Sequence, residues 1–398
     1  MKTNAAAVDL SGLERLRARV MSDPMLQARL GAIEDAARFM AEAAAVAAHF
    51  GIAPADAVGG APQPDPLGLA RWTPTPPNAT AWPPAPWLPV GVVAFGNTLV
   101  VDWAYFGTGP LGEPFFEDEI RRAISRPFNR LFRYRMTLAD FLADAPHHRD
   151  ALGPSGFIFH MSRCGSTLVA RMLAALPQSI VVSEAAPIDT IVQLGRGALP
   201  MTAEQHAQAL AAMVAAYGRR RAGDERRYVI KLDAWHALAL PLFRRAFPDV
   251  PWIFLYRDPV EVLVSQMHQP GTQMIPDIVH PGLFDIDPSE AFPDLNYCAR
   301  VLAKICAAAL EHANGGIAAN YRDLPGAVFT KILPHFALAV GEPEREAMQR
   351  TARQDAKAPS FPFTHDSETK QREATELVRT LADRHLGDVY RRLEAWRG

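Results

Sequence analysis

Cysteine is scarce in this 398-residue sequence, which contains three: Cys164, Cys298 and Cys306. So few cysteines exclude a disulfide framework and favour a reducing compartment. A basic N-terminal stretch followed by an apolar core is also missing, so we expect no secretory signal peptide. The Ala-rich run over residues 36–50 is too short to span a bilayer. We therefore expect a cytoplasmic protein with no membrane partner.

The sequence also lacks an excess of charge of either sign. It has 41 Lys and Arg residues against 43 Asp and Glu residues, a net charge of −2. Because nucleic-acid-binding proteins usually present a basic face, we expect no nucleic-acid partner and interpret Arg219-Arg220-Arg221 as a solvated helix end. No group of His, Cys and Asp has the spacing of a metal site, so we expect no metal. The hydrophobic content of 49% is sufficient for a sizeable core.

The first 150 residues contain no motif that indicates chemistry by itself. A capping aspartate followed by proline predicts one helix from Asp23 to Gly51. A strand pair is expected around the turn Gly96-Asn97, followed by a largely helical stretch from Pro114 to Ala145. We divide the chain into an N-terminal helical region (1–53), a Pro-rich linker (54–89), an accessory strand and helix segment (90–150) and a main domain (151–398).

The most informative stretch runs from Gly156 to Leu176, GFIFHMSRCGSTLVARMLAAL. An apolar run typical of a buried strand is followed by a turn of small residues and then by helical spacing. Such a unit points free backbone N–H groups and a positive helix end at an anion, and predicts a phosphate or sulfate site. It departs from the nucleotide loop G-x-x-x-x-G-K-[ST], because Ser166 stands in the lysine position and the cation is Arg163.

From Gly156 onward, short apolar strands alternate with helices, which predicts an α/β fold with a parallel sheet flanked by helices. An ionisable residue follows each of the expected strands: Arg163, Glu184, Lys231 and Arg257. In open sheets of this class, ligands bind beyond the carboxyl ends of the strands. We therefore expect these side chains to line one site.

Three motifs resemble those of sulfotransferases that use 3′-phosphoadenosine 5′-phosphosulfate (PAPS). FHMSRCGSTLVARML resembles their 5′-phosphosulfate loop, and LYRDPVEVLVS resembles their 3′-phosphate signature. NYRDL at 320–324 is similar to their Y-E-D-L element, with Arg322 in place of the acid. The resemblance covers about residues 155–398. It implies a P-loop NTPase-like sulfotransferase fold, PAPS as donor and 3′-phosphoadenosine 5′-phosphate (PAP) as product. It implies cofactor-binding roles for Arg163, Cys164, Gly165, Ser166, Thr167, Leu168, Arg257, Ser265 and Tyr321.

The same resemblance implies catalytic roles. Glu184 occupies the position of the catalytic glutamate of tyrosylprotein sulfotransferases, which implies that it is the general base. Lys231 matches the family lysine that stabilises the transition state, and Arg163 is expected to assist it. Other sulfotransferases have K-x-H at this strand end, where this chain has Lys231-Leu232-Asp233. The base is therefore left open between Glu184 and a competitor, Asp233 or His236.

Several alternatives remain at this point. Cys164 is either a thiol activated by Arg163 and a helix N-terminus or a small residue filling a tight turn. Lys357 is a weak candidate for a contact to the nucleotide. A P-loop kinase, which needs the missing lysine and Mg²⁺, and a non-catalytic nucleotide-binding protein are the competing functions. The expected partner is a small-molecule or peptide hydroxyl acceptor, oligomers are possible, and residues 1–150 are expected to help select the acceptor.

Overall fold

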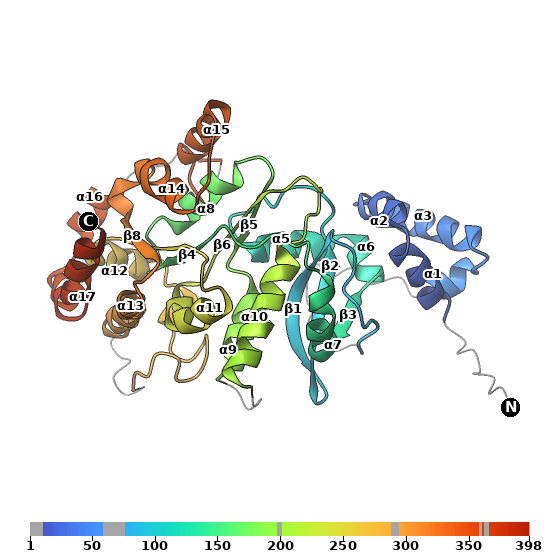
Figure 1. Cartoon of the computed structure of the whole chain (residues 1–398), viewed down its shortest axis with the longest axis horizontal. Coiled ribbons are helices and arrows are strands. Elements are labelled where there is room, and N and C mark those ends of the chain that lie inside the picture. The colour runs from blue at the N-terminus through green and yellow to red at the C-terminus, as the bar shows by residue number, and fades with distance from the viewer. Residues whose placement is uncertain are drawn as a thin grey trace. The chain divides into compact units, whose positions relative to one another are not determined.

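The computed structural model describes residues 11–58, 76–196, 201–287, 294–357, 360–361 and 366–397. The chain divides into two compact units, each coloured by residue number in Figure 1. The first comprises the chain up to Gly109 with Asp118–Arg149 and Arg220–Ala222, and the second comprises Pro110–Glu117, Asp150–Arg219 and the chain from Gly223. None of the described helices combines the length and apolar character that a membrane span requires. Part of the predicted Pro-rich linker, over 59–75, lies outside the described residues.

The first unit opens with a helical region, as predicted. Its helices are α1 (Gly12–Met21), α2 (Pro24–Gly31), α3 (Ala36–His49) and α4 (Pro54–Val58). The single helix expected from Asp23 to Gly51 is wrong, because the chain leaves the helix after Gly31 and starts again. The Asp35 carboxylate accepts the backbone N–H of Arg38 at 2.7 Å and so begins α3.

An antiparallel sheet of order β1-β2-β3 completes this unit. Its elements are β1 (Trp87–Phe95), β2 (Thr98–Tyr105), α5 (Phe116–Ser125, which begins in the second unit), α6 (Pro127–Leu131), β3 (Tyr134–Thr137) and α7 (Leu138–Asp144). The strand pair around Gly96 is confirmed. The stretch expected to be largely helical to Ala145 is so in α5, α6 and α7, but β3, which was not expected, interrupts it. Buried Arg135 of β3 pairs with Asp102 of β2 at 2.9 Å, which fixes this short strand on the sheet.

The second unit has a five-stranded sheet, parallel throughout, of order β5-β6-β4-β7-β8. Its strands are β4 (Gly156–His160), β5 (Ser179–Ser183), β6 (Arg227–Lys231), β7 (Trp252–Tyr256) and β8 (Gly316–Asn320). Helices flank the sheet (Figure 1). The helices are α8 (Ser166–Ala174), α9 (Ala186–Leu194), α10 (Ala203–Tyr217), α11 (Leu240–Ala246), α12 (Pro259–His268), α13 (Asp294–Glu311), α14 (Leu333–His335), α15 (Glu342–Ala352), α16 (Ser367–Glu373) and α17 (Glu376–Arg397). The predicted α/β fold is confirmed.

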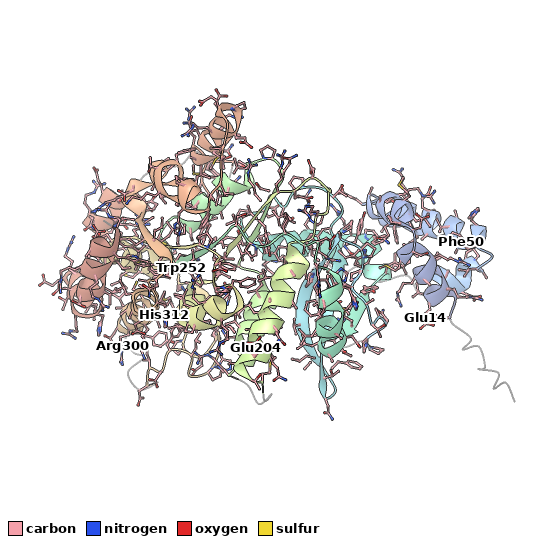
Figure 2. All side chains as sticks on the ribbon, viewed as in Figure 1. Glu14, Phe50, Glu204, Trp252, Arg300 and His312 are labelled. Atoms are coloured by element: carbon pink, nitrogen blue, oxygen red, sulfur yellow. The ribbon has the colours of Figure 1, made fainter. Side chains whose placement is uncertain are left out.

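The core of this unit lies on the strands, which are buried along most of their length. Trp252 of β7, labelled in Figure 2, is fully buried and contacts Phe159 of β4 and Trp396 of α17. Such aromatic contacts account for the near-continuous apolar pattern of the strands, as expected for a sheet covered on both faces.

Strand order places β4 at the centre of the sheet. The chain passes from β4 to the edge strand β5, returns through β6 and then adds β7 on the other side of β4. The direction of winding therefore changes at β4, and the crevice at such a point is the usual ligand site of an open α/β sheet. The loop after His160 begins at this crevice.

Candidate functional site

The loop between β4 and α8 has the backbone shape of an anion site. Ser162, Arg163 and Gly165 have left-handed conformations, with φ of 80°, 52° and 83°. Successive residues of this kind can turn their N–H groups toward a common point. The N-cap residue of α8 is Gly165, which has no side chain with which to cap the helix. The first N–H groups of α8 are thus suited to bind an anion.

His160, the last residue of β4, holds this loop in place by a hydrogen bond. Its Nδ1 accepts the backbone N–H of Ser162 at 3.0 Å, so the ring proton lies on Nε2. Nε2 in turn donates to the Leu232 carbonyl at 2.9 Å and lies 3.4 Å from a Glu184 oxygen. Burial is the main cause that lowers the pKa of His160, so the ring is neutral. Sequence reasoning missed this role, although a polar residue ending a buried strand is a usable signal.

Glu184 and Lys231 form an ion pair at the carboxyl ends of β5 and β6. Lys231 is completely buried, and its Nζ contacts a Glu184 oxygen. Burial alone would raise the pKa of Glu184, but the Lys231 ammonium and a hydrogen bond from His160 outweigh it and lower that pKa to about 2. Glu184 also has a left-handed backbone, with φ of 55°. The pair therefore places an ionised carboxylate in the site at neutral pH.

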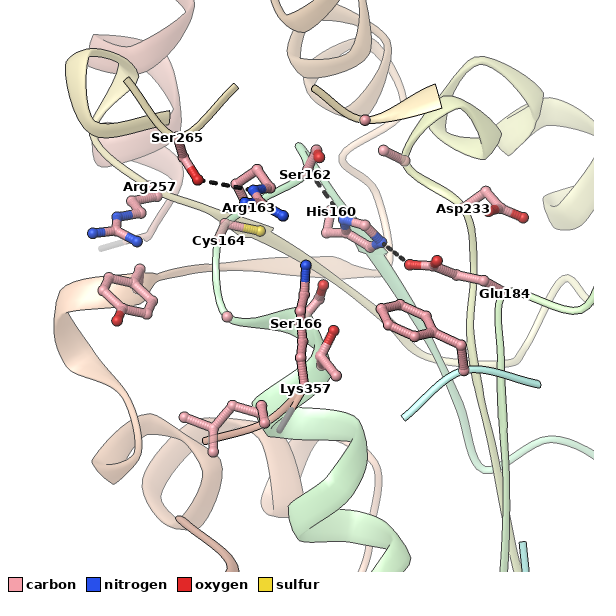
Figure 3. A pocket seen from close by; sticks show the side chains of 18 of the residues that line it. His160, Ser162, Arg163, Cys164, Ser166, Glu184, Asp233, Arg257, Ser265 and Lys357 are labelled. Carbon is pink, nitrogen blue, oxygen red and sulfur yellow. Dashed lines mark hydrogen bonds and ion pairs between the residues drawn. The ribbon is translucent and has the colours of Figure 1, made fainter. Parts of the chain in front are cut away.

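Asp233 is the second carboxyl group at this end of the site (Figure 3). Burial raises its pKa to about 7. His236 accepts the Asp233 backbone N–H at 3.3 Å and donates from Nε2 to Asp189 at 2.9 Å, and Trp235 donates to the same Asp189 oxygen at 2.7 Å. Hydrogen bonds from the Asp233 backbone to His236, and from His236 to Asp189, thus hold Asp233 in place.

Metal-ligand atoms of Asp189, Asp233 and His236 lie within 4.8 Å of one another. Two of the three residues are already joined by the hydrogen bond from His236 to Asp189. Within the described part of the chain, we therefore interpret Asp189 and His236 as residues that hold Asp233 in place rather than as ligands of a metal ion. The absence of a metal stays a prediction.

Arg163 joins the two predicted anion sites. Its Nε donates to the Ser265 hydroxyl on α12 at 2.8 Å, and a terminal nitrogen contacts Gln269 at 3.3 Å. Figure 3 shows the hydrogen bond between Arg163 of the loop and Ser265 of α12. Two motifs that lie 102 residues apart in sequence are therefore in direct contact.

Arg257 follows β7 and is buried between several partners. Its Nε donates to Glu261 at 2.6 Å, and a terminal nitrogen contacts Asp366 at 2.6 Å. The guanidinium lies 4.0 Å from the centre of the Tyr321 ring. Sequence reasoning placed Arg257 and Tyr321 at the site but missed Asp366.

Lys357 brings a further cation to the loop from the segment after α15. Figure 3 shows its side chain extending toward the loop that contains Cys164. The Phe115 ring lies 5.2 Å from the Lys231 ammonium and 5.7 Å from that of Lys357. Burial, and next the charge of Arg163, lower the pKa of Lys357 to about 8. The sequence suggested Lys357 only weakly and gave no signal for Phe115.

These groups surround one cavity of about 410 Å³, a volume in the range that holds one small-molecule ligand. The predicted residues that line it are Arg163, Cys164, Gly165, Ser166, Thr167, Leu168, Glu184, Asp233, Arg257, Ser265 and Tyr321. Lys231 contacts Glu184 and His236 contacts the Asp233 backbone, but neither Lys231 nor His236 is among the lining residues. Figure 3 shows Glu184 and Asp233 at one end of the cavity and Arg257 and Ser265 at the other.

The activated-thiol interpretation of Cys164 is wrong. The side chain is completely buried, and its thiol donates to the Leu255 carbonyl at 3.1 Å. Burial raises the pKa of the thiol to about 12. Because only the thiolate is nucleophilic, Cys164 acts as a small residue that fills the turn.

Residues 154–275 match the model of the sulfotransferase family. No curated protein matches the sequence. Among solved structures, the sulfotransferase STF1 from Mycobacterium tuberculosis is 18% identical, with 63% of this chain and 81% of that chain covered and a TM-score of 0.34. The sulfotransferase domain of the Synechococcus PCC 7002 olefin synthase is 17% identical, with 62% and 96% covered and a TM-score of 0.38.

Proposed function

Because residues 154–275 belong to the sulfotransferase family, we propose that this chain transfers a sulfuryl group from PAPS to a hydroxyl group of an acceptor. The observation that carries this proposal is the Arg163–Ser265 hydrogen bond of 2.8 Å. It joins the loop suited to the 5′ end of the donor to the helix suited to its 3′-phosphate. Two anion sites in one cavity match a ligand that is charged at two separated ends.

The donor-binding roles follow from the positions of the cations. The N–H groups at the start of α8, with Arg163 and Lys357, would hold the 5′-phosphosulfate. Arg257, Ser265 and Lys370 would hold the 3′-phosphate, since all three line the same cavity. Tyr321 lies beneath the Arg257 guanidinium and would fix its plane.

When bound, PAPS would supply a sulfuryl group: the acceptor oxygen bonds to sulfur while the S–O bond to PAP breaks and PAP leaves, and the transfer requires removal of the acceptor's hydroxyl proton. Glu184 is proposed to accept that proton, because it is ionised and lines the cavity. Lys231 contacts Glu184 and would stabilise negative charge that develops on the oxygens during transfer. Positioning and charge account for most of the catalysis expected at such a site.

Donor identity can be tested by ligand-induced thermal stabilisation. We expect PAP and PAPS to raise the melting temperature of the full chain by several degrees without Mg²⁺, since ligand binding to the native state stabilises it. ATP and ADP, which lack a 3′-phosphate, should produce smaller shifts. A Mg²⁺-dependent ATP shift that exceeds the PAP shift would instead support a P-loop kinase. PAP stabilisation without sulfation of any acceptor would support a non-catalytic nucleotide-binding protein.

The two candidate bases predict different pH profiles. With Glu184 as base, its low pKa keeps it ionised, so kcat/KM should not fall between pH 8 and pH 5.5. With Asp233 as base, kcat/KM should fall about tenfold per pH unit below pH 7, where that carboxyl group becomes protonated. We expect the flat profile, with activity lost in Glu184→Gln and kept in Asp233→Asn. The reverse pattern in the two variants would transfer the role to Asp233.

Lys357 should contribute its charge to donor binding. We expect Lys357→Met to weaken PAP binding about tenfold at pH 7, the loss typical of one charge-assisted hydrogen bond. Because the pKa of Lys357 is lowered to about 8, PAP affinity of the unmodified chain should decline as the pH rises from 8 to 9. Lys357→Arg stays protonated and should remove this decline. Calorimetric titration measures both effects.

A matched control is Lys331→Met, since the Lys331 ammonium donates to the Arg397 carbonyl and does not line the cavity. This variant should bind PAP as the unmodified chain does. Equal weakening in Lys331→Met and Lys357→Met would contradict a specific role for Lys357.

A further inference from the structure

Asp366, which immediately precedes α16, pairs with the cations of the proposed 3′-phosphate site. One oxygen contacts Arg257 at 2.6 Å and the other contacts the Lys370 ammonium. Burial disfavours the charge of Asp366, but hydrogen bonds from Lys370 and Arg257 outweigh it and lower its pKa. A full negative charge of the protein itself therefore lies where the donor's 3′-phosphate is proposed to bind.

The two carboxylates that contact Arg257 differ in exposure. The Glu261 side chain is 10% exposed, lies on α12 and also accepts a hydrogen bond from Ser367. The Asp366 side chain is 42% exposed. Exposed ion pairs contribute little to stability and are easily exchanged, whereas buried pairs are costly to break. Glu261 is thus the fixed partner that orients Arg257, and Asp366 is the exchangeable one.

On the basis of the proposed function, we propose that Asp366 is an internal competitor of the 3′-phosphate. Its carboxylate and the phosphate exchange on Arg257 and Lys370 during each catalytic cycle. The phosphate has the higher charge and more acceptor oxygens, so it displaces the carboxylate when the nucleotide binds. When PAP leaves, Asp366 returns, so that Arg257 again contacts two carboxylates, Glu261 and Asp366.

This competition affects turnover rather than the chemical step. A group that weakens substrate and transition state equally raises KM without changing the rate of chemistry. Product release limits kcat in many enzymes, and Asp366 weakens the retention of PAP. Loss of the carboxylate should therefore lower KM for PAPS and slow the release of PAP, so that kcat falls.

The test is Asp366→Asn in the full chain, which keeps the size of the side chain and removes its charge. We expect PAP to bind about tenfold tighter and to dissociate correspondingly more slowly, measured by calorimetry and stopped-flow displacement at fixed pH and salt. Binding of 5′-AMP, which lacks the 3′-phosphate, should change less than threefold. Asp388→Asn removes the same charge from a residue of α17 that contacts Arg391 and Arg392 and does not line the cavity, and it should leave PAP affinity within threefold.

Equal or weaker PAP binding by Asp366→Asn would overturn the inference, because Asp366 would then only hold Arg257 in place. Equal tightening of PAP binding by Asp388→Asn, or of 5′-AMP binding by Asp366→Asn, would also overturn it in favour of a general charge effect. Asp366→Ser, which retains an N-cap residue for α16, should reproduce the gain if the carboxylate is responsible. If the unmodified chain does not bind PAP, the proposed function itself is wrong.

Discussion

Replacement of Lys231 by methionine is expected to lower kcat by about a thousandfold, the loss typical when a preorganised charge is removed from an active site. The ammonium is completely buried and contacts Glu184. Its removal leaves an unpaired carboxylate, which should destabilise the fold by about 3–5 kcal/mol. The pKa of Glu184 should also rise, because Lys231 is a main cause of its depression. Single-turnover sulfation and thermal unfolding measure the two effects.

The double variant Lys231→Met/Glu184→Gln separates catalysis from stability. It removes both charges, so no carboxylate is left unpaired, and most of the lost stability should return. Activity should not return, because neither the base nor the charge stabiliser is present. Recovery of kcat to within tenfold of the unmodified chain would show that the pair is structural and would move the chemistry to Asp233.

Gly165→Ala is expected to weaken PAP binding by about a hundredfold. Gly165 has φ of 83°, a conformation that costs a non-glycine residue about 1–3 kcal/mol. A Cβ atom there would lie 2.8 Å from both Tyr321 and Leu324, which is too close for either to remain in place. The loop would therefore have to move away from Tyr321 and Leu324, and the N–H groups at the start of α8 would lose their common direction. Calorimetric titration with PAP measures the loss.

Gly223→Ala is the matched control for this variant. Gly223 also has a left-handed backbone, with φ of 93°, but a Cβ atom there would meet nothing within 4 Å. The two substitutions share the backbone strain and differ in the contact with Tyr321 and Leu324. Gly223→Ala should lower stability by about 1–3 kcal/mol and leave PAP affinity unchanged. Similar PAP affinity in both variants would contradict a requirement for close packing at Gly165.

Local patterns were sufficient where one segment decides its own structure. The apolar runs of β4, β5, β6 and β7 are buried strands, as predicted. The helical character of the N-terminal region and the hairpin at Gly96 were also predicted, although α2 and α3 stand where one helix was expected. The prediction failed at β3, where Arg135 lies in a four-residue strand that has no apolar alternation of its own. Its pairing with Asp102 is a contact across 33 residues, and no local propensity encodes such a contact.

The residues of the candidate site likewise divide into those that local sequence patterns predicted and those that they did not. Arg163, Glu184 and Arg257 were found because each lies within three residues after the end of a strand, and a parallel sheet gathers all such positions at one edge. Lys357, Phe115 and Asp366 gave little or no signal, since they lie in segments without strand or helix periodicity. Their positions depend on how the chain after α15 and before α5 folds onto the sheet of the second unit. The two interpretations of Cys164 could be separated only in the structure, because burial, which raises the pKa of the thiol, is not visible in a motif.

The sequence by itself determined the class of fold and the location of a loop with the backbone shape of an anion site, because strand and helix periodicity and a short glycine turn are properties of neighbouring residues. Only the tertiary structure decided that Arg163 contacts Ser265 and that carboxylates hold Arg257. It also decided that the pKa values of Glu184 and Asp233 differ. The physical reason is that charge and burial act through space, so the properties of each group depend on partners far away in the chain.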